Sequence, residues 1–334
     1  MDAMVLTRHD SIDAAPLHWR QVAEPVPGRG EVRVKVKCCA ICRTDLHVIE
    51  GELPTQRLPV VPGHQVVGVV DQLGPECDRL RLGERVGIAW LRSTCGRCRF
   101  CVSGRENLCP DARFTGYHAD GGYAEYAVVP EAFAYRIPDA FSDIEATPLL
   151  CAGIIGYRSL ERAAVPEGGR LLIVGFGSSA HVVAQIAHHR GCEMHVATRG
   201  EKHQALALQL GAHWVGAHPS TLPTQVDSAI LFAPVGELVP PILEKLDRGG
   251  TLALAGIHMS SVPALVYEKH LFYERQVRSV TCNTRADGEP LLAEAVAVPV
   301  RPRTTTYPLD AANRALQDLK ADRIQGTGVL LVQA

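Results

Sequence analysis

The chain has 334 residues and carries 34 Lys or Arg against 36 Asp or Glu, which gives a net charge of −2. A length above about 250–300 residues usually divides into more than one domain, so we expect two hydrophobic cores. The near-neutral balance argues against a nucleic-acid partner. The sequence contains no run of about 18 apolar residues, the length needed to cross a membrane. Charged residues within 1–15 do not fit a signal peptide, so we expect a cytoplasmic protein.

The amino-terminal half, to about residue 150, consists of short apolar runs separated by Gly and Pro. Three of these runs, at 31–38, 65–71 and 84–90, predict β-strands because they alternate or are continuously apolar. Turn sequences such as 25–30 and 61–63 join them. This half therefore predicts an irregular, strand-rich domain with its polar sites in loops.

The sequence after Arg170 predicts alternating strands and helices, the order typical of a parallel sheet with helices on its faces. We expect strands at 171–176, 194–198, 228–233, 251–257 and 276–282, and helices at 179–189, 202–210 and 238–246. A helix from Pro308 through Lys320 and a strand at 329–332 are expected to return to the first domain. The segment 283–300 gives no clear pattern.

Four cysteines lie close together in the pattern C-x2-C-x2-C-x7-C, namely Cys95, Cys98, Cys101 and Cys109. This spacing lets one loop surround a tetrahedral ion with four thiolates, as in structural zinc sites. An iron–sulfur cluster would use the same ligands, and Pro110 after the last cysteine is its only further support. Four protein ligands leave no open coordination position, so we interpret this lobe as a structural zinc site.

A second set of metal-binding side chains is spread along the chain at Cys42, His64 and Cys151. Two thiolates and one imidazole would hold a metal and leave a fourth position for water or substrate, as catalytic zinc requires. Each residue taken alone is equally well explained by burial, so the prediction depends on their joint occurrence.

The chain resembles the zinc-dependent medium-chain alcohol dehydrogenases. The resemblance is carried by the two sets of metal-binding residues and by three further segments, 120–126, Cys151-Ala152-Gly153 and Gly175-Phe176-Gly177. The resemblance covers nearly the whole chain. It implies a GroES-like, irregular β-rich catalytic domain (1–151), a Rossmann doubly wound parallel-sheet cofactor domain (152–282) and a return to the catalytic domain (283–334). It also implies two zinc ions per chain, one in each cysteine-containing set.

The resemblance further implies how an alcohol substrate loses its proton. Zinc lowers the pKa of a bound alcohol, so that the alcohol binds as an alkoxide and expels hydride. Thr44 and His47 occupy the positions of the family's proton relay, and Asp45 is expected to orient His64. Position 65 is Gln where the family usually has Glu, which removes a negative charge beside the metal.

The segment Gly175-Phe176-Gly177-Ser178-Ser179-Ala180 follows a predicted strand and opens a predicted helix, which matches the dinucleotide fingerprint G-x-G-x-x-G/A. After the second strand, Thr198 and Arg199 replace the carboxylate that favours NAD, so NADP is the expected cofactor. The resemblance places Arg43 at the cofactor pyrophosphate. It places three more residues at the nicotinamide carboxamide, namely Gly256, Ile257 and His258.

Trp90 occupies the position that lines the substrate channel in the family, where an indole would favour small primary alcohols and aldehydes. Leu53 and Cys39 are further candidates for this pocket, although Trp90 is equally suited to packing in a core. In the family, the strand matching 276–282 pairs across a two-fold axis, so we expect a homodimer or homotetramer.

Two other functions are compatible with parts of the sequence. A zinc-free quinone or enoyl reductase of the same superfamily would lack the ligands Cys42, His64 and Cys151. A non-catalytic sensor of zinc and nucleotide would keep both sites and lose the relay, so Thr44 and His47 favour an enzyme. The sequence therefore predicts an NAD(P)-dependent zinc alcohol dehydrogenase.

Overall fold

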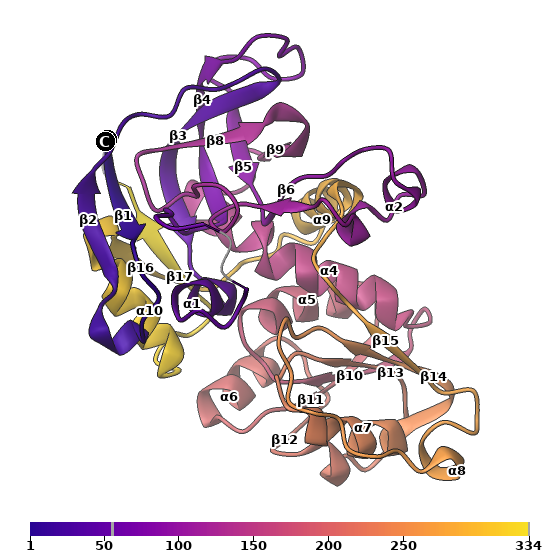
Figure 1. Ribbon diagram of the computed structural model, residues 1–334. Coiled ribbons are helices and arrows are strands. Elements are labelled where there is room, and N and C mark those ends of the chain that lie inside the picture. The colour runs from indigo at the N-terminus through magenta and orange to yellow at the C-terminus, as the bar shows by residue number, and fades with distance from the viewer. Residues whose placement is uncertain (55–56, 333–334) are drawn as a thin grey trace. The chain divides into compact units, whose positions relative to one another are not determined.

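The computed structural model describes residues 1–54 and 57–332, which form two compact units (Figure 1). Unit 1 consists of Met1–Cys151, Cys282–Val296 and Arg301–Ala334, and unit 2 consists of Ala152–Thr281 and Ala297–Val300. No helix within the described ranges is both long enough and apolar enough to pass through a lipid bilayer.

Unit 1 is built around a largely antiparallel sheet in the order β16-β17-β3-β4-β5-β9, with β8 also paired to β3. Its strands are β3 (Glu31–Ala40), β4 (Gln65–Leu73), β5 (Arg85–Ile88), β8 (Tyr126–Pro130), β9 (Ala134–Arg136), β16 (Thr304–Pro308) and β17 (Thr327–Leu331). Two small sheets accompany it, made of β1 (Asp2–Leu6) with β2 (Leu17–Gln21) and of β6 (Leu91–Ser93) with β7 (Arg113–Phe114). The helices of this unit are α1 (Arg43–Ile49), α2 (Arg99–Val102), α3 (Asp143–Ala146), α9 (Arg285–Ala297) and α10 (Ala312–Lys320).

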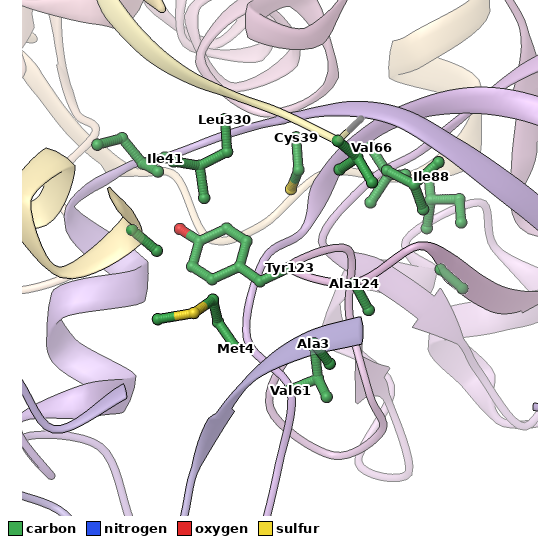
Figure 2. Packing of buried hydrophobic residues seen from close by; sticks show 14 of the residues in the cluster. Ala3, Met4, Cys39, Ile41, Val61, Val66, Ile88, Tyr123, Ala124 and Leu330 are labelled. Carbon is green, nitrogen blue, oxygen red and sulfur yellow. The ribbon is translucent and has the colours of Figure 1, made fainter. Parts of the chain in front are cut away.

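The core of unit 1 surrounds Tyr123, which is fully buried. Figure 2 shows Met4 of β1, Cys39 of β3, Val66 of β4 and Leu330 of β17 around this ring. Burial of each aliphatic side chain of this size contributes about 1.5–3 kcal/mol. Segments from both ends of the chain thus share one core.

Unit 2 contains a six-stranded parallel sheet in the order β12-β11-β10-β13-β14-β15, which confirms the doubly wound fold. The strands are β10 (Arg170–Val174), β11 (Glu193–Ala197), β12 (Trp214–Gly216), β13 (Val226–Leu231), β14 (Leu246–Leu254) and β15 (Gln276–Ser279). The helices are α4 (Ala152–Ala163), α5 (Ser178–His189), α6 (Glu201–Gln209), α7 (Val239–Lys245) and α8 (Tyr267–His270). Figure 1 shows α4 and α5 on one face of this sheet and α7 on the other.

Some elements differ from the predictions. The segment that gave no clear pattern contains helix α9, whose start is capped because the Asp287 carboxylate accepts hydrogen bonds from the N–H and hydroxyl of Thr284. The carboxy-terminal helix begins at Ala312 rather than Pro308, because 304–308 form strand β16 beside β17. Strand β17 pairs with β3, so the end of the chain does return to the first sheet.

Candidate active site and metal centres

Cys42 caps the amino-terminal end of helix α1. Its backbone is extended, and its Sγ accepts a hydrogen bond from the Thr44 N–H at 3.3 Å. Asp45 completes the cap, because its Oδ2 accepts a hydrogen bond from the Cys42 N–H at 2.8 Å. A helix start leaves N–H groups without intrahelical partners, and this pair of side chains satisfies two N–H groups there. Local contacts therefore hold the Cys42 thiol at the helix end.

His64 directly precedes β4, and the residue before it must be glycine. Gly63 has φ +95°, and a Cβ at this position would lie 2.3 Å from Cδ1 of the buried Tyr123. The chain can therefore pass close over the Tyr123 ring only without a side chain. This path brings the His64 imidazole to Cys42, with Nε2 3.2 Å from the Cys42 Sγ.

Cys151 reaches the same place from a distant part of the sequence. It follows the 3-10 helix η4 (Thr147–Leu150), whose four residues are all buried. The ligand atoms of Cys42, His64 and Cys151 all lie within 4.8 Å of one another. Because all three residues belong to unit 1, the fold of this unit alone assembles the predicted three-residue set.

Asp45 has a second contact that bears on the imidazole. Its Oδ1 lies 3.0 Å from Nδ1 of His64, and both side chains are almost completely buried. A carboxylate at Nδ1 fixes the proton on that nitrogen and turns Nε2 toward the Cys42 sulfur. The Asp45 carboxylate therefore ties the Cys42 cap and the His64 ring into one rigid group.

The charges in this cluster favour a thiolate. Hydrogen bonding from the Cys151 thiol and the positive charge of His64 hold the pKa of Cys42 well below its usual value. The same pairing and burial raise the pKa of Cys151 well above its usual value. Burial lowers the pKa of His64, but the negative charges of Asp45 and Cys42 outweigh it and raise that pKa to about 10. The cluster thus keeps at least one sulfur in the form that binds metals.

Gln65 places a polar group beside these ligands. Val67 of β4 is paired with Gly87 of β5, so the two residues share one face of the sheet. A Cβ on Gly87 would lie 2.6 Å from the side chain of Leu150, which shows that η4 covers this face. Gln65 lies two residues before Val67 on β4 and therefore shares this face by strand alternation. Its amide is fully buried, and neither the oxygen nor the nitrogen has a hydrogen-bond partner among the described residues. Such a group is costly without a polar partner, which fits an ion with its solvent in this cluster.

The four-cysteine lobe forms a second cluster of thiols. The sulfurs of Cys95, Cys98, Cys101 and Cys109 lie within 4.8 Å of one another, and none of them forms a disulfide. Backbone N–H groups of Arg97 and Cys98 lower the pKa of Cys95 to about 6. Backbone N–H groups donate to these sulfurs, and the apolar residues Val102 and Leu108 of the lobe are exposed. Four thiols arranged in this way form a closed set of the kind that structural zinc occupies.

Two residues that the sequence did not single out attach this lobe to the rest of unit 1. The Glu106 carboxylate accepts hydrogen bonds from the backbone N–H of Arg285 at 2.7 Å and from its guanidinium at 2.7–3.1 Å. The guanidinium also lies 4.5 Å from the centre of the Phe133 ring. Since 179 residues separate Glu106 from Arg285, no local pattern could have indicated the pair.

Helix α1 carries the residues predicted to move a proton and bind pyrophosphate. Thr44 is buried, Arg43 is exposed and His47 is partly exposed. Residues three apart lie on one side of a helix, so Thr44 and His47 are neighbours on its surface. Nδ1 of His47 is hydrogen-bonded to the carboxylate of Glu52, a residue missed in the sequence although Gly51 before it is a recognisable helix-end signal.

Trp90 lies directly beside the imidazole of His64. Its ring meets His64 edge-on with centroids 4.9 Å apart. It also stacks on Phe114, with centroids 4.9 Å apart and planes inclined by 9°, and on Tyr117 at 5.9 Å. The indole is buried within this aromatic stack. Trp90 therefore both packs in a buried cluster and lies near the predicted metal-binding set.

The two other residues expected near the substrate have different surroundings. Leu53 is partly exposed in the loop that follows α1. Cys39, by contrast, has no exposed surface and belongs to the core around Tyr123 (Figure 2). The physical reason is strand alternation, because Cys39 faces the same side of the sheet as its partner Val66.

Unit 2 places the predicted dinucleotide fingerprint between β10 and α5. Gly175 has φ +85°, and a Cβ there would lie 2.9 Å from the Ala233 backbone nitrogen. Gly177 is the residue before the first turn of α5, which begins with Ser178 and Ser179. This turn lies where the strand order changes direction, between β11 and β13, the usual position of a nucleotide in such sheets.

The residues expected at the other parts of the cofactor also follow strand ends in unit 2. Thr198 follows β11 and is buried, whereas Arg199 is exposed. The N–H of Thr198 donates to Gly216 O at 2.8 Å, so its backbone is fixed. Gly256, Ile257 and His258 lie just beyond β14, with the last two exposed.

Comparison with known proteins agrees with this arrangement. Residues 28–139 match the alcohol dehydrogenase GroES-like domain. The probable alcohol dehydrogenase AdhA of Mycobacterium tuberculosis (strain CDC 1551 / Oshkosh) is 53% identical over 340 residues, covering 99% of this chain and 97% of that protein.

Two solved structures are similar over nearly their full lengths. A cinnamyl alcohol dehydrogenase from Sorghum bicolor has a TM-score of 0.89 at 27% identity, covering 98% of this chain and 97% of the other. A cobalt- and zinc-bound thermostable alcohol dehydrogenase from Pyrobaculum aerophilum has a TM-score of 0.89 at 25% identity, covering 99% of each chain. With its GroES-like and Rossmann domains, the chain therefore belongs to the zinc-type medium-chain alcohol dehydrogenase family.

Proposed function

We propose that the protein is a zinc-dependent alcohol dehydrogenase that transfers hydride between a small primary alcohol, or the corresponding aldehyde, and NAD(P). The observation that carries this proposal is the convergence of Cys42, His64 and Cys151, with ligand atoms within 4.8 Å, in a chain of this family. Two thiols and an imidazole fit zinc, and three protein ligands leave a position for substrate.

In this proposal, Cys42, His64 and Cys151 hold a catalytic zinc, and the four cysteines of the lobe hold a structural one. The bound zinc that the Pyrobaculum aerophilum structure carries supports this choice of metal. When bound, zinc supplies a Lewis acid that lowers the pKa of an alcohol hydroxyl toward neutrality. Asp45 keeps the Nε2 lone pair of His64 available as a ligand.

The proton that the alcohol loses passes to residues of α1. The Thr44 hydroxyl both accepts and donates hydrogen bonds, so it receives this proton and passes its own onward. His47 lies three residues along the helix and is partly exposed, and its imidazole can both accept and donate a proton. These two residues thereby connect a buried hydroxyl to solvent.

For the cofactor, we propose that the turn at Gly175, Phe176 and Gly177 and the first turn of α5 bind the pyrophosphate, with Arg43 as a further ligand. Two features support this assignment: Gly175 has no side chain, and the start of α5 follows Gly177, which provides no side-chain cap. Thr198 and Arg199 would contact the ribose, and the segment 256–258 the carboxamide. A bound nicotinamide cofactor supplies the hydride acceptor.

We expect Arg199→Asp to reverse the preference for NADP over NAD. A carboxylate repels a 2′-phosphate and accepts hydrogen bonds from ribose hydroxyls, and a charge-assisted hydrogen bond is worth about 1.5–3 kcal/mol. The expected loss of kcat/KM with NADP is therefore about 10–100-fold. Steady-state kinetics with each cofactor measure it. Arg248→Asp near the start of β14 makes the same charge change at the other end of the sheet, and an equal loss there would contradict the assignment.

The position of Trp90 supports the proposal that the substrate is small. The indole lies against His64 and is held by Phe114 and Tyr117, so it cannot easily move away from a group that occupies the open position. Leu53 in the loop after α1 is the second proposed pocket residue.

We also propose assembly through the exposed edge of β15 as a homodimer or homotetramer.

The first experiment is elemental analysis of the purified chain combined with turnover of ethanol and benzyl alcohol, followed at the reduced-nicotinamide absorbance. About two zinc ions per chain and oxidation of either alcohol are expected. One zinc or fewer without turnover would contradict the proposal and favour a zinc-free reductase or a sensor. Turnover with NAD alone would contradict only the cofactor preference.

A further inference from the structure

The carboxy-terminal end of helix α1 folds Glu52 back over His47. The helix ends at Ile49, Glu50 is the last residue with helical backbone, and Gly51 has φ +75°. The N–H of Glu52 then donates to the carbonyl oxygen of His47 at 3.0 Å. This is the six-to-one hydrogen bond of a glycine-terminated helix. The backbone alone therefore fixes Glu52 next to the turn that carries His47.

The side chains of these two residues meet as well. Nδ1 of His47 is hydrogen-bonded to Oε2 of Glu52. The His47 side chain is 17% exposed and the Glu52 side chain is 51% exposed, so the carboxylate is the more open of the two to water. The pair thus forms a path from a mostly covered imidazole to an exposed carboxylate.

The other carboxylates of this helix are already engaged. Asp45 is buried and bound to His64 and to the Cys42 N–H. Glu50 accepts hydrogen bonds from the N–H of Ile12 at 2.9 Å and from Lys320 at 2.8 Å. Of the three carboxylates on α1 and its terminal turn, Glu52 is the one that contacts His47 and is open to solvent.

We propose that Glu52 is a positioning residue of the proton relay and its outlet to solvent, an inference that rests on the proposed dehydrogenase function. The carboxylate holds the His47 ring through a hydrogen bond at Nδ1, and the proton that arrives from the substrate side is accepted at Nε2. When Nε2 gains that proton, the Nδ1–H bond breaks and its proton passes to the Glu52 carboxylate. Water or buffer then takes the proton from Glu52, and the imidazole is neutral again.

The contact between His47 and Glu52 is encoded by neighbouring residues. Gly51 is required because of its positive φ and because a Cβ there would lie 3.1 Å from the His9 side chain. The sequence His-x3-Gly-Glu therefore encodes the contact within six residues.

The test compares Glu52→Gln with the unchanged enzyme in dilute buffer, by single-turnover alcohol oxidation at fixed pH. Glutamine keeps the size and an acceptor oxygen but cannot take a proton, so a loss of about tenfold is expected. A high concentration of a small buffer base should restore the rate, because it replaces the outlet. Glu76→Gln removes a carboxylate that is 59% exposed and paired with Arg29 in the same unit, and it should change nothing.

A double-mutant cycle separates this role from a general effect on the fold. If Glu52 acts through His47, Glu52→Gln should cost nothing further in a His47→Gln background. Nitrogen-15 spectra of His47 give a readout without turnover, with the proton on Nδ1 in the unchanged protein and displaced toward Nε2 in Glu52→Ala.

Three outcomes would overturn the inference: an unchanged rate for Glu52→Gln in dilute buffer, a loss that persists in the His47→Gln background, or a His47 tautomer insensitive to Glu52→Ala. Failure of the proposed function would look different, because the unchanged protein would then oxidise no alcohol at any buffer concentration.

Discussion

Cys42→Ala and His64→Ala are each expected to abolish alcohol oxidation while the protein still folds. Each change removes one of the three ligands that converge within 4.8 Å, so the open site would lose its metal. A metal supplies several kcal/mol of catalysis, and 1.36 kcal/mol is a factor of ten, so the expected loss is about 10³-fold or more. Metal analysis, turnover and circular dichroism of the purified variants measure it.

Cys77→Ala is the matched control for these variants. Cys77 is a partly exposed cysteine of the same unit that belongs to neither thiol cluster, and its thiol donates to Glu31 O. The Cys77→Ala variant should retain both alcohol turnover and metal content. Full activity of Cys42→Ala and His64→Ala would remove the catalytic assignment, whereas unfolding of both would show that the cluster is needed for structure.

Cys98→Ala is expected to lower stability instead, with loss of about one zinc ion per chain. The lobe has few buried residues and exposes Val102 and Leu108, so the ion would replace a missing core. A loss of several kcal/mol corresponds to a fall in Tm of about 10 °C for a unit of this size. Thermal unfolding followed by circular dichroism measures this fall.

The effect of Cys98→Ala on activity should be secondary. Glu106 and Arg285 still attach the lobe to unit 1, so alcohol oxidation at low temperature should survive with the zinc of the other cluster. Comparison with Cys77→Ala corrects for the loss of any cysteine. An unchanged Tm together with two bound zinc ions would contradict the structural role of the lobe.

Much of the candidate site was predictable because its parts are local in sequence. The spacing of Cys95, Cys98, Cys101 and Cys109 limits how far the thiols can separate, and the structure brings the sulfurs together. Likewise, the glycine turn before α5 depends on one strand end and the helix start that follows it. Short loops restrict the chain to few arrangements, so spacing alone carries the information.

Other parts could not be read from local patterns. Helix α9 contains Pro290, and its apolar residues do not follow the period of an amphipathic helix, so the sequence did not predict it. Its buried face is defined by the parts of the folded unit that pack on it. Cys39 was expected beside the substrate, yet strand alternation turns it into the core with Val66. Such outcomes depend on which face of a strand or helix is covered, and only distant segments decide that.

By itself, the sequence determined the family and the two fold classes, and it singled out the cysteine and histidine side chains that the structure gathers in two clusters, because ligand chemistry and short spacings do not depend on distant contacts. Only the tertiary structure decided that Cys151 meets Cys42 and His64, that the Gln65 amide is buried with no hydrogen-bond partner among the described residues, and that Arg285 holds Glu106. These contacts join segments far apart in the chain. They form only once the core around Tyr123 has closed and the entropy of bringing those segments together has been offset by burial.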